Sequence, residues 1–350
     1  MLDAIITAVN RQWHLARRPE GVFSESDFVL RETAVPEQLA DGELLIRLIY
    51  LSMDPTNRVW TREKYTYMDP VPLNDVMRGI AMGEVVRSRN AGFPEGAIVT
   101  GVLGWEDYAV SDGTGLSIVE PQEDVPLPAH FALFGHIGIP AYVGLTEIGQ
   151  LKAGETLVVS AAAGAVGSLT VQIGKILGAR VVAIAGSDEK CRYLREELGA
   201  DATINYKSGP IRDAMAAACP EGIDVYFDNV GGEMLEAALV LINMNARIVM
   251  CGAISIYNND CDVPGPRNLF NLLFKRARIE GLVCFDYAAD PELWTRVHED
   301  IARWHREGRI RYRLDIVEGL ENTPAAVARL FTGANQGKQL VRVADEPVHA

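Results

Sequence analysis

The chain has no cysteine among its first 190 residues, and the cysteines it has are widely spaced: Cys191, Cys219, Cys251, Cys261 and Cys284. Their number is odd and no two form a short motif, so the pattern argues against a disulfide framework and favours a reducing cytoplasm. Positive charge is also scarce, because 33 lysines and arginines stand against 47 acids and leave a net charge of −14. An acidic chain without a basic stripe is not expected to bind nucleic acid.

Long hydrophobic runs are absent too. No stretch of about 18 apolar residues occurs, so we expect no membrane span. The N-terminus has Asp3 in a short apolar stretch and no positively charged segment before that stretch. We therefore expect no signal peptide. Apolar residues are nevertheless plentiful, at 48% of the chain, which excludes disorder as its main state. At roughly 150 residues per domain, the length of 350 residues predicts about two domains.

The pattern of apolar and turn residues changes near residue 150. Before it, short apolar runs such as 43–51 and 97–102 alternate with turns rich in Gly and Pro, which predicts an all-β barrel or sandwich. After it, apolar runs alternate regularly with helical pattern, which predicts a parallel sheet with helices on both faces. The runs are 157–160, 180–185, 202–205, 223–228, 246–251 and 279–285.

The pattern of apolar residues changes again toward the end of the chain. Residues 291–307 carry apolar side chains three and four positions apart, which predicts an amphipathic helix. Two strands are then predicted at 312–317 and 339–343, and we expect them to return to the first domain. The predicted domains are residues 1–130 with 308–350, and residues 131–307.

The strongest single motif is the turn Ala162-Ala163-Gly164-Ala165-Val166-Gly167. It matches G-x-G-x-x-G with alanine in the first glycine place, and it lies between a predicted strand and a predicted helix at 166–177. Gly164 lets the backbone approach a pyrophosphate, and Gly167 lets the helix pack closely on the strand, while the helix N-terminus offers N–H groups. The turn predicts a dinucleotide site, with a ligand-free packing turn as the alternative.

The end of the next strand bears on the choice between NAD and NADP. An NAD site usually has an acid there, about 20 residues on, to hold the ribose 2′-hydroxyl. This chain has the small, uncharged Ala185-Gly186-Ser187. Lys190 follows in the first helical turn, where a cation opposes the helix dipole and a 2′-phosphate would reverse that penalty. The pattern favours NADP(H), although Asp188 could still bind a ribose hydroxyl and Lys190 could be a solvated surface lysine.

A zinc-dependent alcohol dehydrogenase is the first alternative to test. Catalytic zinc takes three protein ligands, typically Cys or His, and leaves one position open. The first 190 residues supply only His14, His130 and His136, whose spacing forms no ligand set. His298 and His305 lie on the predicted helix 291–307, which has the pattern of a surface element. We therefore expect no metal, and hydride chemistry without a metal Lewis acid.

Several stretches, taken in order, resemble one family. The chain resembles, nearly end to end, the zinc-independent medium-chain dehydrogenase/reductase superfamily, and within it the branch of prostaglandin reductases, alkenal/one oxidoreductases and curcumin-reductase-like enzymes. The matching stretches are Asn10–Trp13 (NRQW), Leu51–Pro55 (LSMDP), Val76–Gly79 (VMRG), Tyr108–Gly113 (YAVSDG), Ser160–Gly167 (SAAAGAVG), Ser187–Lys190 (SDEK), Asn205–Lys207 (NYK), Phe227–Gly232 (FDNVGG), Cys251–Asn258 (CGAISIYN) and Asn335–Lys338 (NQGK).

The resemblance implies an α/β fold, with a Rossmann doubly wound parallel sheet that binds NADPH and a GroES-like β-barrel catalytic domain. It also implies a homodimer. Cofactor contacts are implied for the phosphate turn, the region of the 2′-phosphate, the loops after the later strands and the tail. These residues are Gly164, Ala165, Val166, Gly167, Ser187, Lys190, Tyr206, Asn229, Cys251, Gly252, Ala253, Ile254, Ser255 and Asn335.

The implied reaction is hydride transfer from NADPH to the β-carbon of an α,β-unsaturated ketone or aldehyde. Negative charge then builds on the carbonyl oxygen, and without a metal a hydrogen-bond donor must meet it. Tyr257 matches the tyrosine commonly assigned to the family's substrate pocket, and its hydroxyl or the nicotinamide ribose 2′-hydroxyl would be that donor. A quinone oxidoreductase of the same superfamily and a non-catalytic NADPH-binding protein are the alternatives.

This chain departs from the family pattern at two places. The family often shows Asp-Pro-Tyr-Met-Arg where this chain has Thr56 and Asn57 in the third and fourth positions. It also often shows a threonine where this chain has Pro140, and His136 is a new polar residue four positions earlier. We hypothesise that Thr56, Asn57 and His136 reshape the substrate pocket, with neutral drift at its rim as the alternative.

Overall fold

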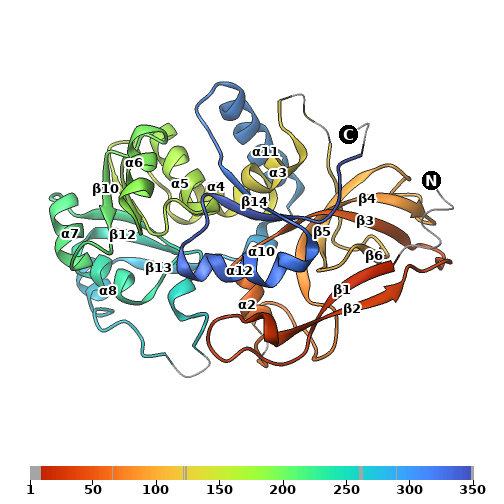
Figure 1. The fold of residues 1–350 in the computed structure, drawn as a ribbon. Coiled ribbons are helices and arrows are strands. Elements are labelled where there is room, and N and C mark those ends of the chain that lie inside the picture. The colour runs from red at the N-terminus through yellow and green to blue at the C-terminus, as the bar shows by residue number, and fades with distance from the viewer. Residues whose placement is uncertain are drawn as a thin grey trace. The chain divides into compact units, whose positions relative to one another are not determined.

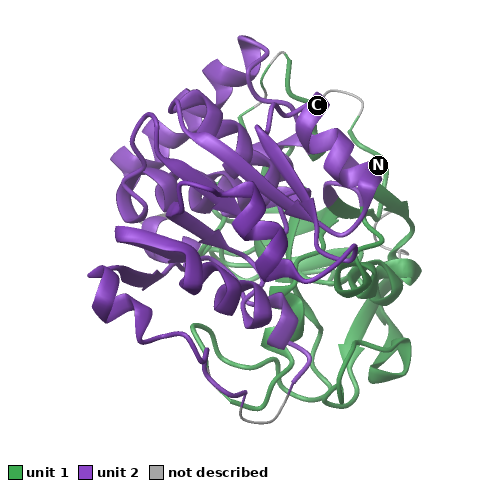
Figure 2. Cartoon of the chain, turned by 90° about the vertical axis from the view of Figure 1, so that its left-hand side faces the viewer, with its two compact units in different colours: residues 1–128, 315–335, 339–350 green, residues 129–314, 336–338 purple. Residues whose placement is uncertain are grey.

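The computed structural model describes residues 9–64, 66–120, 122, 124–259, 263–288 and 290–347. The chain divides into two compact units, which Figure 2 shows in different colours. Unit 1 comprises residues 1–128, 315–335 and 339–350, and unit 2 comprises residues 129–314 and 336–338. The bounds differ from the predicted ones mainly in the tail, because residues 308–314 and 336–338 belong to unit 2.

Unit 1 is built on a seven-stranded sheet of order β14-β15-β3-β4-β5-β7, with β6 also paired to β3, and on the separate pair β1-β2. Single end residues of β14 and β15 fall in unit 2. Its elements are β1 (Val9–Leu15), η1 (Glu25–Asp27), β2 (Phe28–Ala34), β3 (Leu44–Ser52), α2 (Thr56–Trp60), β4 (Arg78–Ser88), β5 (Ile98–Gly104), β6 (Tyr108–Ser111), β7 (Ser117–Ile118), β14 (Leu314–Glu318), η4 (Leu320–Asn322), α12 (Thr323–Thr332) and β15 (Lys338–Arg342).

Strand β3 is the centre of this sheet. Its sequence, LLIRLIYLS, is rich in bulky apolar residues, and every residue except Arg47 is buried. One edge pairs with β4, while the other is shared, with Leu44–Arg47 against β6 and Tyr50–Ser52 against β15. The last strand of the chain therefore pairs directly with one of the first.

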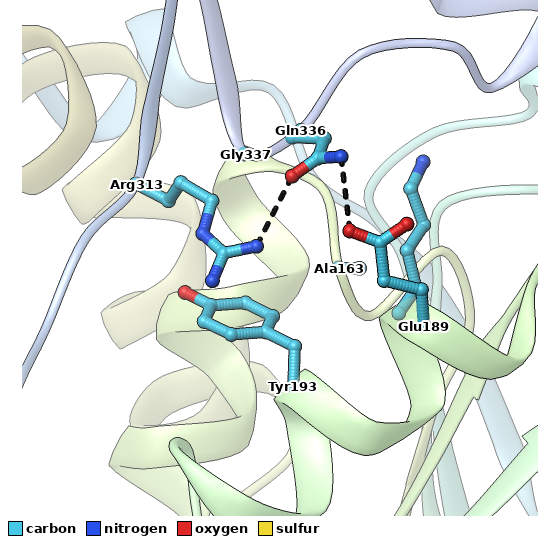
Figure 3. A pocket seen from close by; sticks show the side chains of 7 residues that line it. Ala163, Glu189, Tyr193, Arg313, Gln336 and Gly337 are labelled. Atoms are coloured by element: carbon cyan, nitrogen blue, oxygen red, sulfur yellow. Dashed lines mark hydrogen bonds between the residues drawn. The ribbon is translucent and has the colours of Figure 1, made fainter.

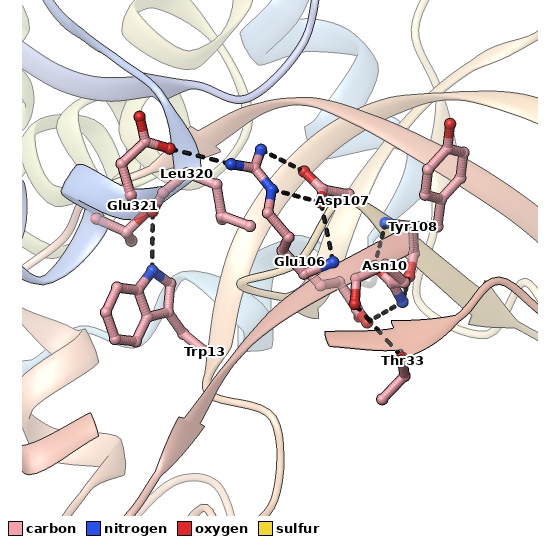
Figure 4. Close-up of polar contacts among 10 residues, drawn as sticks. Asn10, Trp13, Thr33, Glu106, Asp107, Tyr108, Leu320 and Glu321 are labelled. Atoms are coloured by element: carbon pink, nitrogen blue, oxygen red, sulfur yellow. Dashed lines mark hydrogen bonds and ion pairs between the residues drawn. The ribbon is translucent and has the colours of Figure 1, made fainter. Parts of the chain in front are cut away.

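The stretch Asn10–Trp13 lies on β1 and ties three parts of unit 1 together (Figure 4). The Arg11 guanidinium forms ion pairs with Asp107 at 2.9 Å and with Glu321 at 3.1 Å. The Trp13 indole N–H donates to the carbonyl of Leu320 at 2.8 Å. This matched stretch is therefore explained by its structural contacts with Asp107, just before β6, and with η4.

Glu106 is a buried acid beside the same strand, with 8% of its surface exposed. Its Oε2 accepts hydrogen bonds from Gln12 Nε2 at 2.6 Å and Asn10 Nδ2 at 3.5 Å. Burial nevertheless dominates, because no cation compensates the charge, and it raises the pKa of Glu106 from 4.5 to about 7. The folded protein therefore favours the neutral acid.

We expect Glu106→Gln to change how stability depends on pH. A carboxyl whose pKa is higher in the folded state stabilises the fold below its unfolded pKa, and that contribution is lost as pH rises through about 7. Between pH 4 and pH 8 the wild type should lose up to about 3 kcal/mol relative to the variant. Urea unfolding at both pH values measures this difference.

Glu321→Gln is the matched control, because the Glu321 side chain is 56% exposed and lies in the same group of contacts (Figure 4). Its unfolding free energy should follow the wild type across the pH range. Parallel curves for wild type and Glu106→Gln would show that Glu106 does not titrate in this way.

Unit 2 contains a six-stranded sheet of order β10-β9-β8-β11-β12-β13, in which every pair of neighbours is parallel. This is the doubly wound order 3-2-1-4-5-6 of a dinucleotide-binding sheet. Helix α3 (Leu127–Leu133) joins the two units. The elements of unit 2 are α4 (Gly135–Val143), η2 (Gly144–Ile148), β8 (Thr156–Val159), α5 (Ala165–Ile176), β9 (Arg180–Ala185), α6 (Asp188–Glu196), β10 (Ala202–Asn205), α7 (Ile211–Ala218), β11 (Ile223–Asp228), α8 (Gly232–Leu241), β12 (Ile242–Met250), η3 (Ile254–Ile256), α9 (Asn271–Lys275), β13 (Arg278–Gly281), α10 (Cys284–Ala288) and α11 (Pro291–Arg306).

Helices flank this sheet (Figure 1). Strand residues such as Val158, Tyr226 and Ile248 form one buried cluster with Met215 of α7 and Leu235 of α8. Helix α5 contacts β8 and β9, and α4 packs on α5, α10 and α11. Burial among helices explains why these strands are nearly continuous apolar runs.

The predicted strand 279–285 is too long. β13 ends at Gly281, and the N–H of Leu282 makes the next hydrogen bond, to Met250, at 3.0 Å. Cys284 then begins α10. An apolar run alone does not show where a strand ends and a short helix begins.

Among the residues that the structure describes, the continuous helical stretch Leu127–Ile148, made of α3, α4 and η2, is long and apolar enough to cross a membrane by length and composition. The sequence contains no uninterrupted apolar run here, because His130, Gly135 and His136 break it. Of its most apolar window, 78% is buried inside the protein, so its hydrophobicity is explained by packing as a core helix.

Candidate active site

The candidate site lies in unit 2 at the carboxyl ends of β8 and β11, where the strand order reverses. Ligands of doubly wound sheets bind at such switch points. Ser160 Oγ accepts a hydrogen bond from the Asn229 N–H at 2.8 Å, and Asn229 Nδ2 donates to the Ser160 carbonyl at 2.8 Å. The turn after β8 and the loop after β11 are thereby fastened to each other.

Asp228 organises the loop after β11. Its carboxylate is buried, and Oδ1 accepts from the Ser160 hydroxyl at 2.9 Å and from the N–H groups of Val230 and Gly231 at 2.9 and 3.0 Å. Burial raises the pKa of Asp228, while these donors oppose the shift. Its backbone carbonyl accepts from Cys251 N–H at 2.9 Å, so Asp228 positions the next loop as well.

The phosphate turn has the geometry that the sequence predicted. Gly164 is the N-cap of α5, whose first N–H groups lack carbonyl partners within the helix. A Cβ on Gly167 would lie 2.4 Å from the carbonyl oxygen of Ala161 and 2.8 Å from Cα of Ala162. The turn therefore needs glycine there, and it aims the positive end of α5 out of the sheet, which fits a pyrophosphate.

The tail segment 336–338 runs beside this turn. Gly337 forms a parallel β-bridge with Gly164, and Lys338 N–H donates to the carbonyl of Arg313 at 2.9 Å. Together with α6 the segment encloses a small pocket next to the turn (Figure 3). Its lining residues are Ala163, Glu189, Lys190, Tyr193, Arg313, Gln336 and Gly337.

The region expected to hold a 2′-phosphate lies at the start of α6. Ser187 is the N-cap, and its hydroxyl accepts from the N–H of Lys190 at 3.2 Å. Tyr206 follows β10 and is 39% exposed, with Lys207 Nζ lying 5.8 Å from the centre of its ring. Asp188 Oδ1 accepts a hydrogen bond from Asn205 Nδ2 at 2.7 Å. The donors and cations here fit a phosphate.

Tyr257 lies just after η3, in the loop that follows β12. Its hydroxyl oxygen accepts from the N–H of Ala253 at 3.0 Å. The loop that carries it is fastened to the loop after β11, because Ser255 Oγ donates to the carbonyl of Val230 at 2.6 Å. Burial raises the pKa of the Cys251 thiol far above its usual range, so this thiol stays protonated.

The residues predicted to bind the cofactor or the substrate are divided between the two units. The cofactor residues from Gly164 to Ser255, together with Tyr257 and His136, belong to unit 2, and Asn335, Thr56 and Asn57 belong to unit 1. Asn57 is fully buried, its Oδ1 accepts from the Asp54 N–H at 2.9 Å, and its Nδ2 donates to the Arg78 carbonyl at 3.3 Å. These contacts fasten the start of α2 to β4, and Asn57 exposes no surface to a substrate in this structure.

Thr56 and His136 have contacts that the sequence did not predict. The Thr56 hydroxyl hydrogen-bonds to that of Tyr67, which is 38% exposed. The His136 ring lies 6.1 Å from the ring of Phe131 in an edge-on arrangement. The contact with Tyr67 was not predictable from the sequence, because an isolated tyrosine in a loop has no distinctive pattern.

Among the described residues, no three His, Cys, Asp or Glu side chains gather into a group that could hold a metal ion. The expectation of metal-free chemistry stays a prediction.

Comparisons with known proteins cover nearly the whole chain. Residues 11–119 match a family model for the N-terminal domain of oxidoreductases, and residues 165–302 match one for zinc-binding dehydrogenases. The NADPH-dependent curcumin reductase of Escherichia coli is 40% identical over 96% of this chain and 98% of its own length. Prostaglandin reductase 1 of Rattus norvegicus is 39% identical, with coverage of 95% and 98%.

Comparison with solved structures gives the same family. CurA in complex with NADPH from Vibrio vulnificus has a TM-score of 0.90 and 40% identity, and the match covers 96% of this chain and 100% of that chain. The predicted fold class is thereby confirmed. A quinone oxidoreductase from Pseudomonas syringae, at 20% identity and a TM-score of 0.74, shares the fold alone. The chain belongs to the medium-chain dehydrogenase/reductase superfamily, in the branch that contains the curcumin reductase and prostaglandin reductase 1.

Proposed function

We propose that the chain is an NADPH-dependent reductase of the carbon–carbon double bond of α,β-unsaturated ketones and aldehydes. One observation supports the cofactor choice: Asp188, the first acid after β9, accepts a hydrogen bond from the Asn205 amide, so its carboxylate is engaged with the protein. Lys190 lies in the first turn of α6 and is the cation proposed to bind the 2′-phosphate. The NADPH-dependent relatives at about 40% identity support the reaction.

Bound NADPH would supply a hydride from its nicotinamide to the substrate β-carbon. The residues of the phosphate turn would hold its pyrophosphate, and Lys190 and Tyr206 its 2′-phosphate. Tyr257 is the protein group suited to meet the charge that develops on the carbonyl oxygen. The Ala253 N–H donates to the phenol oxygen, which withdraws electron density and makes the hydroxyl proton a stronger donor. The α-carbon then takes a proton from water or an acid.

Reduction of quinones is the second candidate function. Two quinone reductases among the solved structures are 20% and 16% identical to the chain, whereas the curcumin reductase and a 2-alkenal reductase are 40% and 37% identical. The substrate class of the closer branch is therefore the better supported one. A non-catalytic NADPH-binding protein is the third, and the presence of Tyr257 in the site speaks against it.

The test mixes purified protein with NADPH and a panel of enals, enones, quinones and alcohols, and follows the absorbance of the reduced cofactor. We expect turnover with enones and enals and little with alcohols. Absence of turnover with every enone and enal would refute the proposed reaction, and equal use of NADH would refute the cofactor assignment.

We also propose that the protein is a cytoplasmic homodimer. None of Cys191, Cys219, Cys251 and Cys284 is in a disulfide, in keeping with a reducing compartment. β13 stands at the end of the strand order, and all four of its residues are exposed. Such an edge can pair with a second sheet. Next to it, Phe270, Leu273 and Phe274 are 73%, 67% and 63% exposed, which supports an apolar contact between two copies.

Leu273→Glu should therefore dissociate the dimer, because a dimer interface would have to bury the new charge without a partner. Light scattering behind size-exclusion chromatography measures the mass of wild type and variant. Leu73→Glu is the control, since Leu73 is 47% exposed but lies in unit 1. A wild type that elutes as a monomer, or a variant that stays dimeric, would contradict the proposed interface.

A further inference from the structure

Gly186 is the first residue after β9, at the end of the strand from which an acid holds the ribose 2′-hydroxyl in NAD sites. Its backbone does not require glycine, because its φ lies outside the left-handed region. Room for a 2′-phosphate does not require glycine either, since alanine or serine is also small and uncharged. The absence of a side chain must therefore be explained by what surrounds this residue.

The ring of Tyr206 occupies the space beside Gly186. A Cβ on Gly186 would lie 3.0 Å from Cε1 of Tyr206, 3.2 Å from its hydroxyl oxygen and 3.3 Å from its Cζ, and these are the three nearest atoms. Carbon atoms attract best at about 3.5–4.0 Å, so a Cβ would be in close contact with the ring. The hydroxyl end of the ring thus lies where a side chain at position 186 would begin.

The sheet brings the two residues together. Asn205 lies opposite Ala185 in the parallel ladder of β9 and β10, so the residues that follow, Tyr206 and Gly186, leave neighbouring strands at the same edge. The N–H of Tyr206 donates to the carbonyl of Ala185 at 3.1 Å, which fixes the backbone of the tyrosine. A side chain added at Gly186 therefore has to move the ring, because the strand pairing holds the backbone in place.

The position of this ring bears on cofactor choice. An aspartate at position 186 would carry its carboxylate outward from a Cβ that is already in contact with the phenol. The tyrosine in its observed place and an NAD-selecting acid at the end of β9 therefore exclude each other. The lack of an acid and the presence of the tyrosine, which the sequence presents as separate features, are sterically coupled.

We propose that Gly186 and Tyr206 form one specificity-determining pair, in which the phenol takes the place of the NAD-selecting carboxylate and glycine is the residue that lets it lie there. The inference rests on the proposed use of NADPH. Gly186 is the positioning residue of the pair, because it acts on the 2′-phosphate only through the ring of Tyr206.

A double-mutant cycle on Gly186→Ala and Tyr206→Ala tests the coupling, with NADPH affinity measured by isothermal titration calorimetry. Gly186→Ala adds no charge and should weaken NADPH binding about tenfold, the effect of moderate overpacking. In the Tyr206→Ala background the same change should cost less than about twofold, because the ring is gone. Gly209→Ala is the matched control from the same connection, since a Cβ there would meet nothing within 4 Å.

NADH provides the second measurement, which does not depend on Gly186→Ala. Gly186→Asp alone should gain little affinity for NADH, because the phenol blocks the new carboxylate. Gly186→Asp combined with Tyr206→Ala should bind NADH about tenfold more tightly than Tyr206→Ala does, the effect of one hydrogen bond from the ribose hydroxyl to a charged acceptor. Circular dichroism reports whether each variant is folded.

An equal loss of NADPH affinity from Gly186→Ala in both backgrounds would overturn the inference, since the loss would then not act through the ring. An equal gain in NADH affinity from Gly186→Asp with and without Tyr206 would also overturn it, and both results leave the proposed cofactor intact. A wild type that binds NADH as tightly as NADPH would refute the use of NADPH itself, and this inference with it.

Discussion

Gly167→Val is expected to abolish useful cofactor binding while leaving most of the protein folded. The first atom of any side chain at this position would lie 2.4 Å from the Ala161 carbonyl oxygen and 2.8 Å from Cα of Ala162. Both atoms are backbone atoms of the phosphate turn, so the turn must change shape to accept it. If strain of about 2–3 kcal/mol is lost from the binding free energy, the affinity falls roughly 30- to 150-fold.

Quenching of protein fluorescence on titration with NADPH measures this loss, and circular dichroism reports whether the variant is folded. NADH should be affected equally, because the pyrophosphate is common to both cofactors. Gly265→Val is the control, since a Cβ there would meet nothing within 4 Å. A folded Gly167→Val protein with wild-type affinity would refute the role given to this turn.

The parts of the site that the sequence predicted are those with a local signature. The turn around Gly164 combines a strand, small residues and a helix within one short stretch, and each of these has a recognisable composition. Lys190 was distinctive for a similar reason, because a cation in the first turn of a helix opposes the dipole. The structure has α5 and α6 beginning at Ala165 and Asp188, close to where these local signals put them.

The parts that the sequence did not predict depend on contacts between distant segments. Gln336 and Arg313 come from the end of the chain and reach α6 only because Gly337 pairs with Gly164. Nothing in the composition of the tail indicates that three of its residues leave unit 1 for unit 2. The resemblance to a family pointed to the tail, but to Asn335, whose side chain belongs to unit 1.

Asp188 shows why a residue type alone leaves a choice open. From the sequence it could be a ligand for a ribose hydroxyl, because an acid near the end of the second strand has that role in NAD sites. Only the contact with Asn205, a residue of the next strand, indicates that its carboxylate is engaged elsewhere. Asn57 is the converse case, since the sequence predicts its polar side chain in a pocket, whereas it is buried in hydrogen bonds to Asp54 and to Arg78 at the start of β4.

Tyr257→Phe is expected to lower kcat for enone reduction about 100-fold with little change in affinity for NADPH. Removing one donor to a developing oxyanion lowers kcat by roughly 100- to 1,000-fold in enzymes that depend on it. The lower end applies here, because the ribose 2′-hydroxyl of the cofactor is a second donor. The hydroxyl oxygen accepts from Ala253 N–H, so the phenol is oriented by the loop and its proton is directed away from that bond.

Steady-state kinetics with a small enone at saturating NADPH give kcat for the wild type and the variant, and fluorescence titration gives the affinity for NADPH. Tyr312→Phe removes a phenol from the same unit and serves as the control, with kcat expected within about twofold of the wild type. If Tyr257→Phe lowers kcat less than about threefold, the ribose hydroxyl or water meets the enolate charge. If it lowers affinity for NADPH instead of kcat, Tyr257 acts through the loop 251–257 and is a positioning residue. Only a selective loss in kcat supports Tyr257 as the donor, because a donor to the enolate stabilises charge that exists only once the hydride has begun to move.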